Sequence, residues 1–317
     1  MTECFVGIDT SNYTTSAAIC TKDGAVVANL KIPLPVKAGE CGLRQSDAVF
    51  AHVKNLPSIM QSLAKELTGF EPVAIGVSAT PRPQEGSYMP CFLSGIAAAE
   101  SFAAAANIPL LRFSHQEGHI MAATYSAGAM HLLNAERFAA FHVSGGTTEV
   151  LLATPHASGF DIELFSATAD INAGQAIDRI GVMLGLNFPC GKELEKLAEK
   201  NEKKIPKSRI SVKDGYCNLS GLENMATKLW QESGDAALVA AFTQQFIADT
   251  LIAMTNELDA RIPNLSIVYA GGVMSNRYLQ TRLGERENTY FAEPQFSADN
   301  AAGVALLCRL AYMKDNK

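Results

Sequence analysis

Residues 138–168, FAAFHVSGGTTEVLLATPHASGFDIELFSAT, repeat a pattern of apolar strands and small-residue turns. An apolar run leads into the turn SGGTT, a second apolar run follows, and a glycine-containing turn leads into a third. Residues 4–32, CFVGIDTSNYTTSAAICTKDGAVVANLKI, follow the same plan, with KDG at the second turn. Two such copies in one chain indicate an internal duplication of a strand–turn–strand unit.

The first turn of each copy would present small residues and free backbone N–H groups at the edge of a sheet, which suits phosphate binding. A third element, residues 265–283 (LSIVYAGGVMSNRYLQTRL), is an apolar strand that runs through a Gly-Gly turn into a helix. Nucleotides are also held at strand–glycine turn–helix junctions. One such turn alone is most often an ordinary hairpin, so the prediction of a nucleotide site depends on the three elements together.

Helices are expected between these elements, at 47–68, 91–106, 171–186, 191–201 and 234–260. Strands that alternate with helices are typical of an α/β fold. The charged, proline-containing segment 201–210, NEKKIPKSRI, is predicted to be a solvated loop, with a phosphate-contacting patch as the alternative.

The composition is that of a compact protein with two domains or one large α/β unit: 317 residues, 48% hydrophobic and 18% charged. A formal net charge of −6 gives no global sign of nucleic-acid binding, so such binding would need a local patch or a partner. The seven cysteines include no C-x-x-C pair, which favours a reducing compartment. With no signal-peptide pattern and no apolar run of the ~18 residues that a membrane span needs, we expect a cytoplasmic protein without membrane contact.

The stretch SHQEGHI, residues 114–120, contains two histidines four residues apart. On a helix, His115 and His119 would lie on one face, the spacing that zinc peptidases use in H-E-x-x-H. Gln116 stands where those enzymes have their general base, and an amide cannot accept a proton from water. The pattern therefore predicts a metal site and argues against peptide hydrolysis.

Together these features resemble one family, the catalytic subunits of tRNA threonylcarbamoyladenosine synthase (TsaD-like proteins, with the older label O-sialoglycoprotein endopeptidase or glycoprotease). The resemblance runs through nearly the whole chain. The matching motifs, in chain order, are GIDTSNYTT, FAHVKNLP, SHQEGH, VSGGTTEV, AGQAIDRIGVMLGLNFPCGKELEKLA, LSGLEN, AGGVMSN and SADNAAGVA.

The resemblance implies an α/β fold of the duplicated actin-like ATPase (ASKHA, ribonuclease H-like) type, with two lobes and a nucleotide cleft between them. The expected ranges are 1–135 for the N-terminal lobe with the metal-ligand helix, 136–300 for the second lobe with the nucleotide-binding loops, and 301–317 for a C-terminal helix that returns to the first lobe.

The resemblance also implies the site residues. A zinc or iron ion would be held by His115, His119 and Asp299, with His142 as a fourth candidate that could instead be a histidine bonded to backbone. ATP or threonylcarbamoyl-AMP would be the nucleotide ligand. Its phosphates would lie on Ser144, Gly145, Gly146, Thr147 and Thr148; its ribose and base would contact Asp178, Gly191, Glu195, Gly271, Gly272 and Asn276. His52 also matches a family position, where a structural hydrogen bond is at least as good an explanation.

The departures from the family pattern affect the chemistry. Asn12, Tyr13, Thr14 and Thr15 follow the first turn where the family has C-D-E-T-A, so two acidic residues are absent; Gln175 replaces a glutamate, Glu223 a lysine and Cys190 a glycine. These changes favour a divergent paralogue. Whether catalysis survives the changes at Tyr13, Thr14 and Gln175 is left open.

Three functions follow from these observations. The leading one is a metal- and adenine-nucleotide-dependent threonylcarbamoyl or carbamoyl transferase, with tRNA as one possible acceptor. The second is a nucleotide-binding scaffold or regulator with little chemistry of its own, paired through its N-terminal helices with a protein partner or with a second copy. The third, a metallopeptidase, is disfavoured by Gln116 and by the nucleotide loops.

Overall fold

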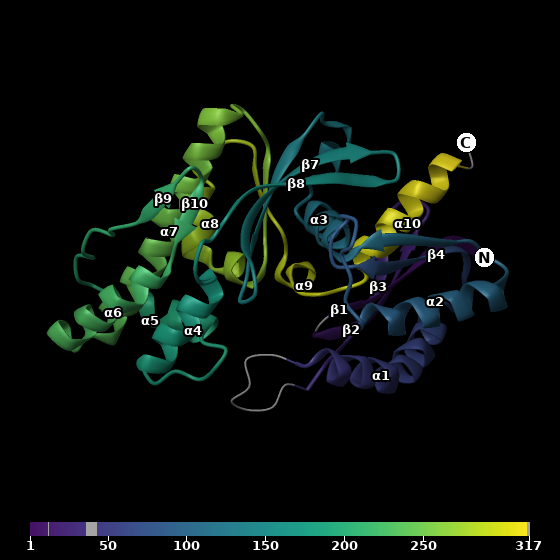
Figure 1. Ribbon diagram of the computed structural model, residues 1–317, viewed down its shortest axis with the longest axis horizontal. Helices are drawn as coiled ribbons and strands as arrows, with labels where there is room; N and C mark the ends of the chain where they lie inside the picture. The colour runs from purple at the N-terminus through teal and green to yellow at the C-terminus, as the bar shows by residue number, and fades with distance from the viewer. Residues whose placement is uncertain (12, 36–42, 316–317) are drawn as a thin grey trace. The chain divides into compact units, whose positions relative to one another are not determined.

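The computed structural model describes residues 1–11, 13–35 and 43–315 (Figure 1). The predicted departure at Asn12 and the cysteine at position 41 lie outside these residues. The chain forms two compact units. Unit 1 comprises Met1–Asn134, Thr154–Ile162 and Gln295–Lys317, and unit 2 comprises Ala135–Ala153 and Glu163–Pro294.

Unit 1 is built on a five-stranded sheet in the order β3-β2-β1-β4-β5. Its strands are β1 (Thr2–Ser11), β2 (Thr14–Thr21), β3 (Val26–Pro33), β4 (Phe70–Thr80) and β5 (Leu110–Ser114). The first three strands are antiparallel, and β4 and β5 extend the sheet in parallel with β1. Its helical elements are α1 (Gln45–Glu66), α2 (Phe92–Ala106), α3 (His115–Ser126), the 3₁₀ turn η1 (Met130–Asn134), α9 (Pro294–Ser297) and α10 (Ala302–Asp315).

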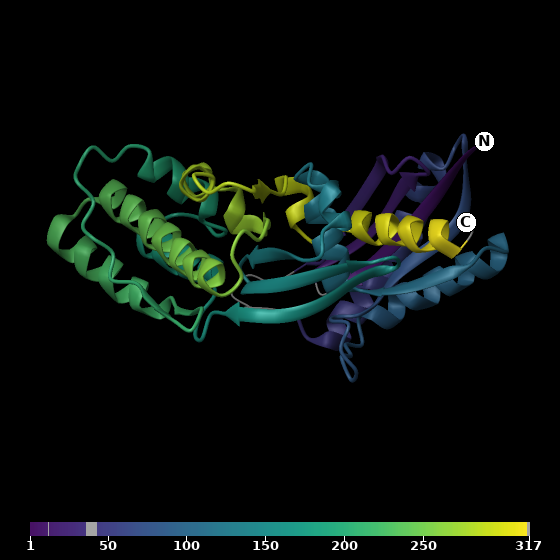
Figure 2. The same cartoon turned by 90° about the horizontal axis from the view of Figure 1, so that it is seen from above.

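Successive residues of β1 point to opposite faces of this sheet, as the strand period of two requires. Cys4, Val6 and Ile8 belong to the apolar cluster that α1 and α2 complete. On the other face Phe5 packs edge-on against Tyr312 of α10. Two helices thus cover one face of the sheet and α10, drawn in yellow in Figure 2, covers the other.

Unit 2 is built on a five-stranded sheet in the order β12-β11-β6-β7-β8. Its strands are β6 (Phe138–Val143), β7 (Thr148–His156), β8 (Gly159–Ala167), β11 (Ile267–Ala270) and β12 (Thr289–Phe291), and β9 (Ser211–Lys213) and β10 (Tyr216–Asn218) form a separate hairpin. Its helical elements are α4 (Ala173–Met183), α5 (Gly191–Ala198), α6 (Ser220–Ser233), α7 (Ala236–Arg261), the 3₁₀ turn η2 (Gly272–Ser275) and α8 (Arg277–Leu283).

The two sheets share one topology. In unit 1 the hairpin strands β3-β2-β1 continue into parallel β4 and β5, and in unit 2 β8-β7-β6 continue into parallel β11 and β12. The repeat begins at the two stretches, 4–32 and 138–168, that the sequence singled out. The predicted duplicated α/β fold is therefore confirmed.

The unit boundaries differ from the predicted ranges at two places. Thr154–Ile162, at the turn between β7 and β8, and Gln295–Asn300 both belong to unit 1. The reason is packing: Phe296 lies edge-on against Tyr125 of α3, and Gly159 lies beside the Glu117 side chain. The range 301–317 consists mainly of α10, which packs on α3 and on the unit 1 sheet.

Helix α7 is long and apolar enough to cross a membrane by length and composition alone. However, 72% of its most apolar window is buried inside the protein. Leu238, Phe242, Phe246 and Leu251 pack there against the sheet of unit 2 and its other helices. This burial is that of a core helix.

Candidate functional site

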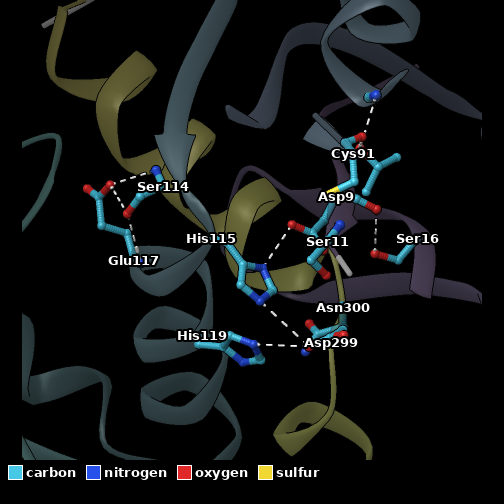
Figure 3. A network of polar contacts seen from close by, with 12 residues as sticks. Asp9, Ser11, Ser16, Cys91, Ser114, His115, Glu117, His119, Asp299 and Asn300 are labelled. Carbon is cyan, nitrogen blue, oxygen red and sulfur yellow. Dashed lines mark hydrogen bonds and ion pairs between the residues drawn. The ribbon is translucent and has the colours of Figure 1, made fainter. Parts of the chain in front are cut away.

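Helix α3 begins with a capping box that orients its first turn. The Ser114 hydroxyl accepts a hydrogen bond from the Glu117 N–H at 3.2 Å, and the Glu117 carboxylate accepts one from the Ser114 N–H at 2.8 Å. Glu117 is buried and points away from His115 and His119 (Figure 3). The acidic residue inside the H-x-x-x-H motif thus stabilises the start of the helix and does not face the two histidines.

Among the described residues, one cluster of His, Cys, Asp and Glu side chains could hold a metal ion: His115, His119 and Asp299. Their ligand atoms all lie within 4.8 Å of one another. Asp299 Oδ1 lies 3.3 Å from His119 Nε2 and 3.6 Å from His115 Nε2. Figure 3 shows both imidazole rings turned toward Asp299, which comes from the segment before α10. The resemblance named these three residues from distant parts of the chain, and the fold of unit 1 brings them together.

A contact between two glycines lets α3 and α10 approach this closely. A Cβ atom on Gly303 would lie 1.9 Å from the carbonyl oxygen of Gly118, inside any possible contact distance. Gly118 stands between the two histidines, and Gly303 follows Asp299 by four residues. The backbone contact therefore sets the distance between the histidines and the aspartate.

Asp9, at the end of β1, is a residue of this site that the sequence analysis did not identify. Its side chain is fully buried, and Oδ1 lies 3.0 Å from His115 Nδ1. A carboxylate in this position accepts the Nδ1 proton and so fixes Nε2 as the nitrogen that faces Asp299. The signal was present in the sequence, because an aspartate at the end of an apolar strand needs a partner.

The carboxylates give the site a strong preference for positive charge. Burial acts to lower the pKa of His115, but the neighbouring Asp9 and Asp299 raise it to about 10. Burial acts in the opposite sense on Asp299, and the two imidazoles nevertheless hold the pKa of Asp299 well below its usual value. A metal cation would meet the same electrostatic requirement as the proton on His115, so the residues present fit a divalent metal.

His142 lies on β6 of unit 2, where it pairs with Glu149 of β7 and Ala270 of β11. Its role as a fourth metal ligand stays a prediction. His52 is buried on α1, and its Nδ1 lies 2.9 Å from the hydroxyl of Thr15. That contact is the structural hydrogen bond that the sequence analysis offered for this histidine.

The predicted phosphate residues form the turn between β6 and β7. The Ser144 hydroxyl accepts hydrogen bonds from the Gly146 and Thr147 N–H groups at 3.3 and 3.1 Å. Apart from the chain neighbours, no atom of the described residues lies within 4 Å of a Cβ built on Gly145 or Gly146, so the outer side of the turn is open to a ligand. The Thr148 hydroxyl faces inward and accepts a hydrogen bond from the first N–H of α4.

The predicted ribose and base residues lie on α4, α5 and the segment after β11. Asp178 is half-buried, accepts a hydrogen bond from the Cys190 N–H at 2.8 Å, and has its pKa raised by burial. The neighbouring Gly191 has open space beside it. The Asp178 carboxylate thus holds the start of α5.

Glu195 and Asn276 also have local partners. Glu195 accepts a hydrogen bond from the Arg277 N–H at 2.7 Å, and Asn276 caps α8 and donates to Gln244 at 2.7 Å. Glu195 and Gln244, the two partners of this pair of contacts on α5 and α7, line a pocket of about 350 Å³ between α5, α7 and α8, together with Arg277.

The Gly-Gly turn after β11 meets the phosphate turn at its base. A Cβ on Gly271 would lie 2.2 Å from the carbonyl oxygen of Val143, the last residue of β6, and Gly271 has a φ of 99°. Only glycine fits this combination of contact and backbone angle. Gly272 has open space beside it. Unit 2 therefore brings the two predicted glycine turns to the same edge of its sheet.

The residues that depart from the family pattern are part of the fold. Gln175 accepts a hydrogen bond from the Asn172 N–H at 3.0 Å, as a glutamate would, and helps to begin α4. Glu223 forms an exposed ion pair with Arg179. Tyr13 is exposed, and its carbonyl oxygen accepts a hydrogen bond from the Leu34 N–H.

Comparisons with solved structures show the fold. The chain is similar to HypF from T. kodakarensis (12% identity, TM-score 0.63), an alignment that covers 99% of this chain and 48% of HypF. It is also similar to a ROK family glucokinase from Streptomyces griseus (12% identity, TM-score 0.53), with 98% of this chain and 99% of the glucokinase aligned. Both are actin-like ATPase folds, so the predicted fold type is confirmed.

Sequence comparison shows the family. A protein from Streptococcus uberis named tRNA N6-adenosine threonylcarbamoyltransferase is 30% identical over 98% of this chain and 92% of its own length. A protein of the same name from Streptococcus pyogenes serotype M5 is 32% identical over 71% of this chain and 66% of its own length. The family profile described as TsaD, tRNA N6-adenosine threonylcarbamoyltransferase, matches residues 38–306. The chain therefore belongs to the TsaD family of tRNA N6-adenosine threonylcarbamoyltransferases.

Proposed function

We propose that this protein transfers a threonylcarbamoyl group from threonylcarbamoyl-AMP to the N6 amino group of an adenosine in tRNA. The reaction is that named for its relatives. The observation that carries the proposal is the convergence of His115, His119 and Asp299, with a buried carboxylate behind the first histidine. A protein that only binds a nucleotide does not need two histidines and an aspartate arranged around one point.

The metal would be held by the Nε2 atoms of His115 and His119 and by the Asp299 carboxylate. Two neutral imidazoles and one carboxylate suit zinc or iron(II) and leave coordination positions open for a substrate oxygen. When bound, the metal supplies a Lewis acid for the carbamoyl–phosphate group. Asp9 keeps the Nδ1 proton of His115 in place, so that Nε2 remains available.

The adenylate phosphate would bind at the β6–β7 turn. Its oxygens would accept hydrogen bonds from the Gly146 and Thr147 N–H groups, in place of the Ser144 hydroxyl. The absence of side chains at Gly145 and Gly146 leaves space for the phosphate. In the transfer, N6 forms a bond to the carbamoyl carbon, the bond from that carbon to the phosphate oxygen breaks, AMP leaves, and one N6 proton passes to a phosphate oxygen of the departing AMP and from there to water. Thr14 and Gln175 carry no charge and cannot accept that proton.

A cytosolic location is part of the proposal. The six cysteines of the described residues are all free and buried, which agrees with a reducing compartment.

The test combines metal analysis with a transfer assay on purified protein, threonylcarbamoyl-AMP and unmodified tRNA. We expect His119→Ala to lose at least about tenfold in metal affinity and ~10²-fold or more in transfer rate, with an unchanged circular dichroism spectrum. His156→Ala is the matched control, because His156 is an exposed histidine whose ring contacts its neighbour Ser158. Adenylate binding without any transfer by the unaltered, metal-loaded protein would instead identify a nucleotide-binding scaffold.

A further inference from the structure

Residues 200–213, KNEKKIPKSRISVK, are the most basic segment of a chain whose formal net charge is −6. We refer to these residues as the basic strap. It contains the basic residues Lys200, Lys203, Lys204, Lys207, Arg209 and Lys213 and the single acidic residue Glu202. All seven side chains are exposed. The strap joins α5 to the β9–β10 hairpin and lies wholly within unit 2.

The strap is attached to unit 2, although most of it has no regular secondary structure. Ile205, Ile210 and Val212 pack against the apolar core of the unit. The amide of Gln245 on α7 donates hydrogen bonds to the Pro206 carbonyl at 3.1 Å and to the Ser208 hydroxyl at 3.4 Å. A segment held in this way presents its charges in fixed positions.

In the second half of the strap, the side chains form two rows, one exposed to solvent and one against the protein. From residue 207 to residue 213, exposed residues alternate with half-buried ones, the pattern of an extended chain with one face on the protein. Lys207, Arg209 and Lys213 all point outward in this alternation. Neighbours in the outward row stand about 6.8 Å apart, twice the rise of an extended residue.

Most of these charges have no acidic partner among the residues that the structure describes. Lys203 pairs with Asp235 at 2.7 Å. Over the described ranges 1–11, 13–35 and 43–315, no ion pair is found for Lys200, Lys204, Lys207, Arg209 or Lys213. Five unpaired cations on one strap repel one another, and a polyanion would relieve that repulsion.

We propose that the basic strap binds the phosphodiester backbone of the RNA substrate, an inference that rests on the proposed function. The exposed row consists of lysine, arginine and serine, whereas the centre of a protein interface is apolar and poor in lysine. An extended row of cations fits a linear polyanion, and phosphate contacts position RNA without reading its sequence. The strap thus supplies the local patch that an acidic protein needs to bind nucleic acid.

The test removes four of the five unpaired charges in K204A/K207A/R209A/K213A, leaving Lys200 next to α5. Binding of unmodified tRNA is measured by fluorescence anisotropy over a series of salt concentrations, together with the KM for tRNA in the transfer assay. We expect binding at least about tenfold weaker at ~0.1 M salt and a plot of log Kd against log salt that is flatter by about three to four units, roughly one for each cation removed. The affinity for threonylcarbamoyl-AMP should be unchanged.

Two further variants make the result specific to the strap. K22A/K54A/K65A/K314A removes four exposed lysines from unit 1 and should leave both the affinity for tRNA and its salt dependence near those of the unaltered protein. K204R/K207R/K213R keeps every charge and should bind tRNA as the unaltered protein does. Thermal unfolding of each variant identifies any loss of folded protein.

The outcomes separate this inference from the proposed function. If the alanine variant binds and modifies tRNA with an unchanged KM and salt slope, the strap does not contact RNA and the proposed function stands. If the unaltered, metal-loaded protein neither binds nor modifies tRNA, both proposals fail. If the arginine variant loses binding as the alanine variant does, charge is not the cause and the strap proposal is wrong.

Discussion

Asp9 shows how one buried carboxylate sets the chemistry of a neighbouring side chain. It holds the Nδ1 proton of His115, and so determines which nitrogen faces Asp299. The two histidines could be found from their helical spacing alone. Asp299 was named only through resemblance, because no local pattern joins residues so far apart. Asp9 was overlooked because a polar residue at a strand end has many ordinary explanations.

Asp9→Asn should weaken metal binding about 10–100-fold, the usual effect of losing the partner of a ligating histidine. Asparagine keeps the size of the side chain, but its neutral amide no longer favours a proton on Nδ1. Competition titration of zinc against a chelating dye measures the effect. Asp23→Asn, at an exposed turn of the same sheet, is the control. Equal affinity in Asp9→Asn and the unaltered protein would show that Asp9 does not orient the ligand.

At the scale of elements, the sequence predicts helices whose limits are marked by residues in or next to the helix. It does not predict a helix whose first N–H groups are capped by a residue distant in the chain. Predicted helices at 91–106 and 234–260 agree with α2 and α7 within two residues at each end. Helix α6 was missed, and its start has no side-chain cap of its own. Instead Asp170 accepts hydrogen bonds from the Leu219 and Ser220 N–H groups at 2.8 and 3.0 Å. Because Asp170 lies about 50 residues before α6, the residues next to the helix do not indicate this cap.

The crossing of α3 and α10 depends on glycine at position 303. Gly303→Ala should lower the free energy of unfolding by about 1–3 kcal/mol, because the new methyl group forces the two backbones apart. Metal affinity should fall with it, since Asp299 and the histidines lie on either side of this contact. Urea denaturation and zinc titration measure the two effects.

Gly221→Ala, within α6, is the matched control for that substitution. Its Cβ would come no closer than 3.9 Å to any neighbour, so this change should be neutral or slightly stabilising. A Gly303→Ala protein as stable as Gly221→Ala would mean that the contact is looser than described.

At the scale of the whole molecule, the sequence revealed the repeat but not the full sheets. The antiparallel part of each sheet could be predicted because its strands and turns follow one another directly in the chain. Strands β4, β5 and β12 pair in parallel across long crossovers, and nothing in their own residues indicates their neighbours. Gln295–Asn300 likewise belongs to unit 1 through contacts distant in sequence, which no pattern in these residues indicates.

The division into units predicts two separate patterns of hydrogen exchange. Chelation should speed exchange in α3 and in residues 295–300, because the three clustered metal residues all lie in unit 1. Added threonylcarbamoyl-AMP should slow exchange at residues 144–148 and 271–276 in unit 2. Mass spectrometry of peptic peptides measures both. Faster exchange of β6 on chelation would support His142 as a fourth ligand, and no change in α3 would contradict the metal site.

Under the proposed function, the order of His115, His119 and Asp299 along the chain would affect when the metal binds during synthesis. His115 and His119 leave the ribosome before most of unit 2 has been translated, and Asp299 leaves after all of it. Until Asp299 has been made, the nascent chain offers only the two imidazoles of this site. Two imidazoles alone bind transition metals weakly and with little selectivity. The complete site exists only when everything between these residues has been made, so metal loading would be a late event that marks a finished molecule.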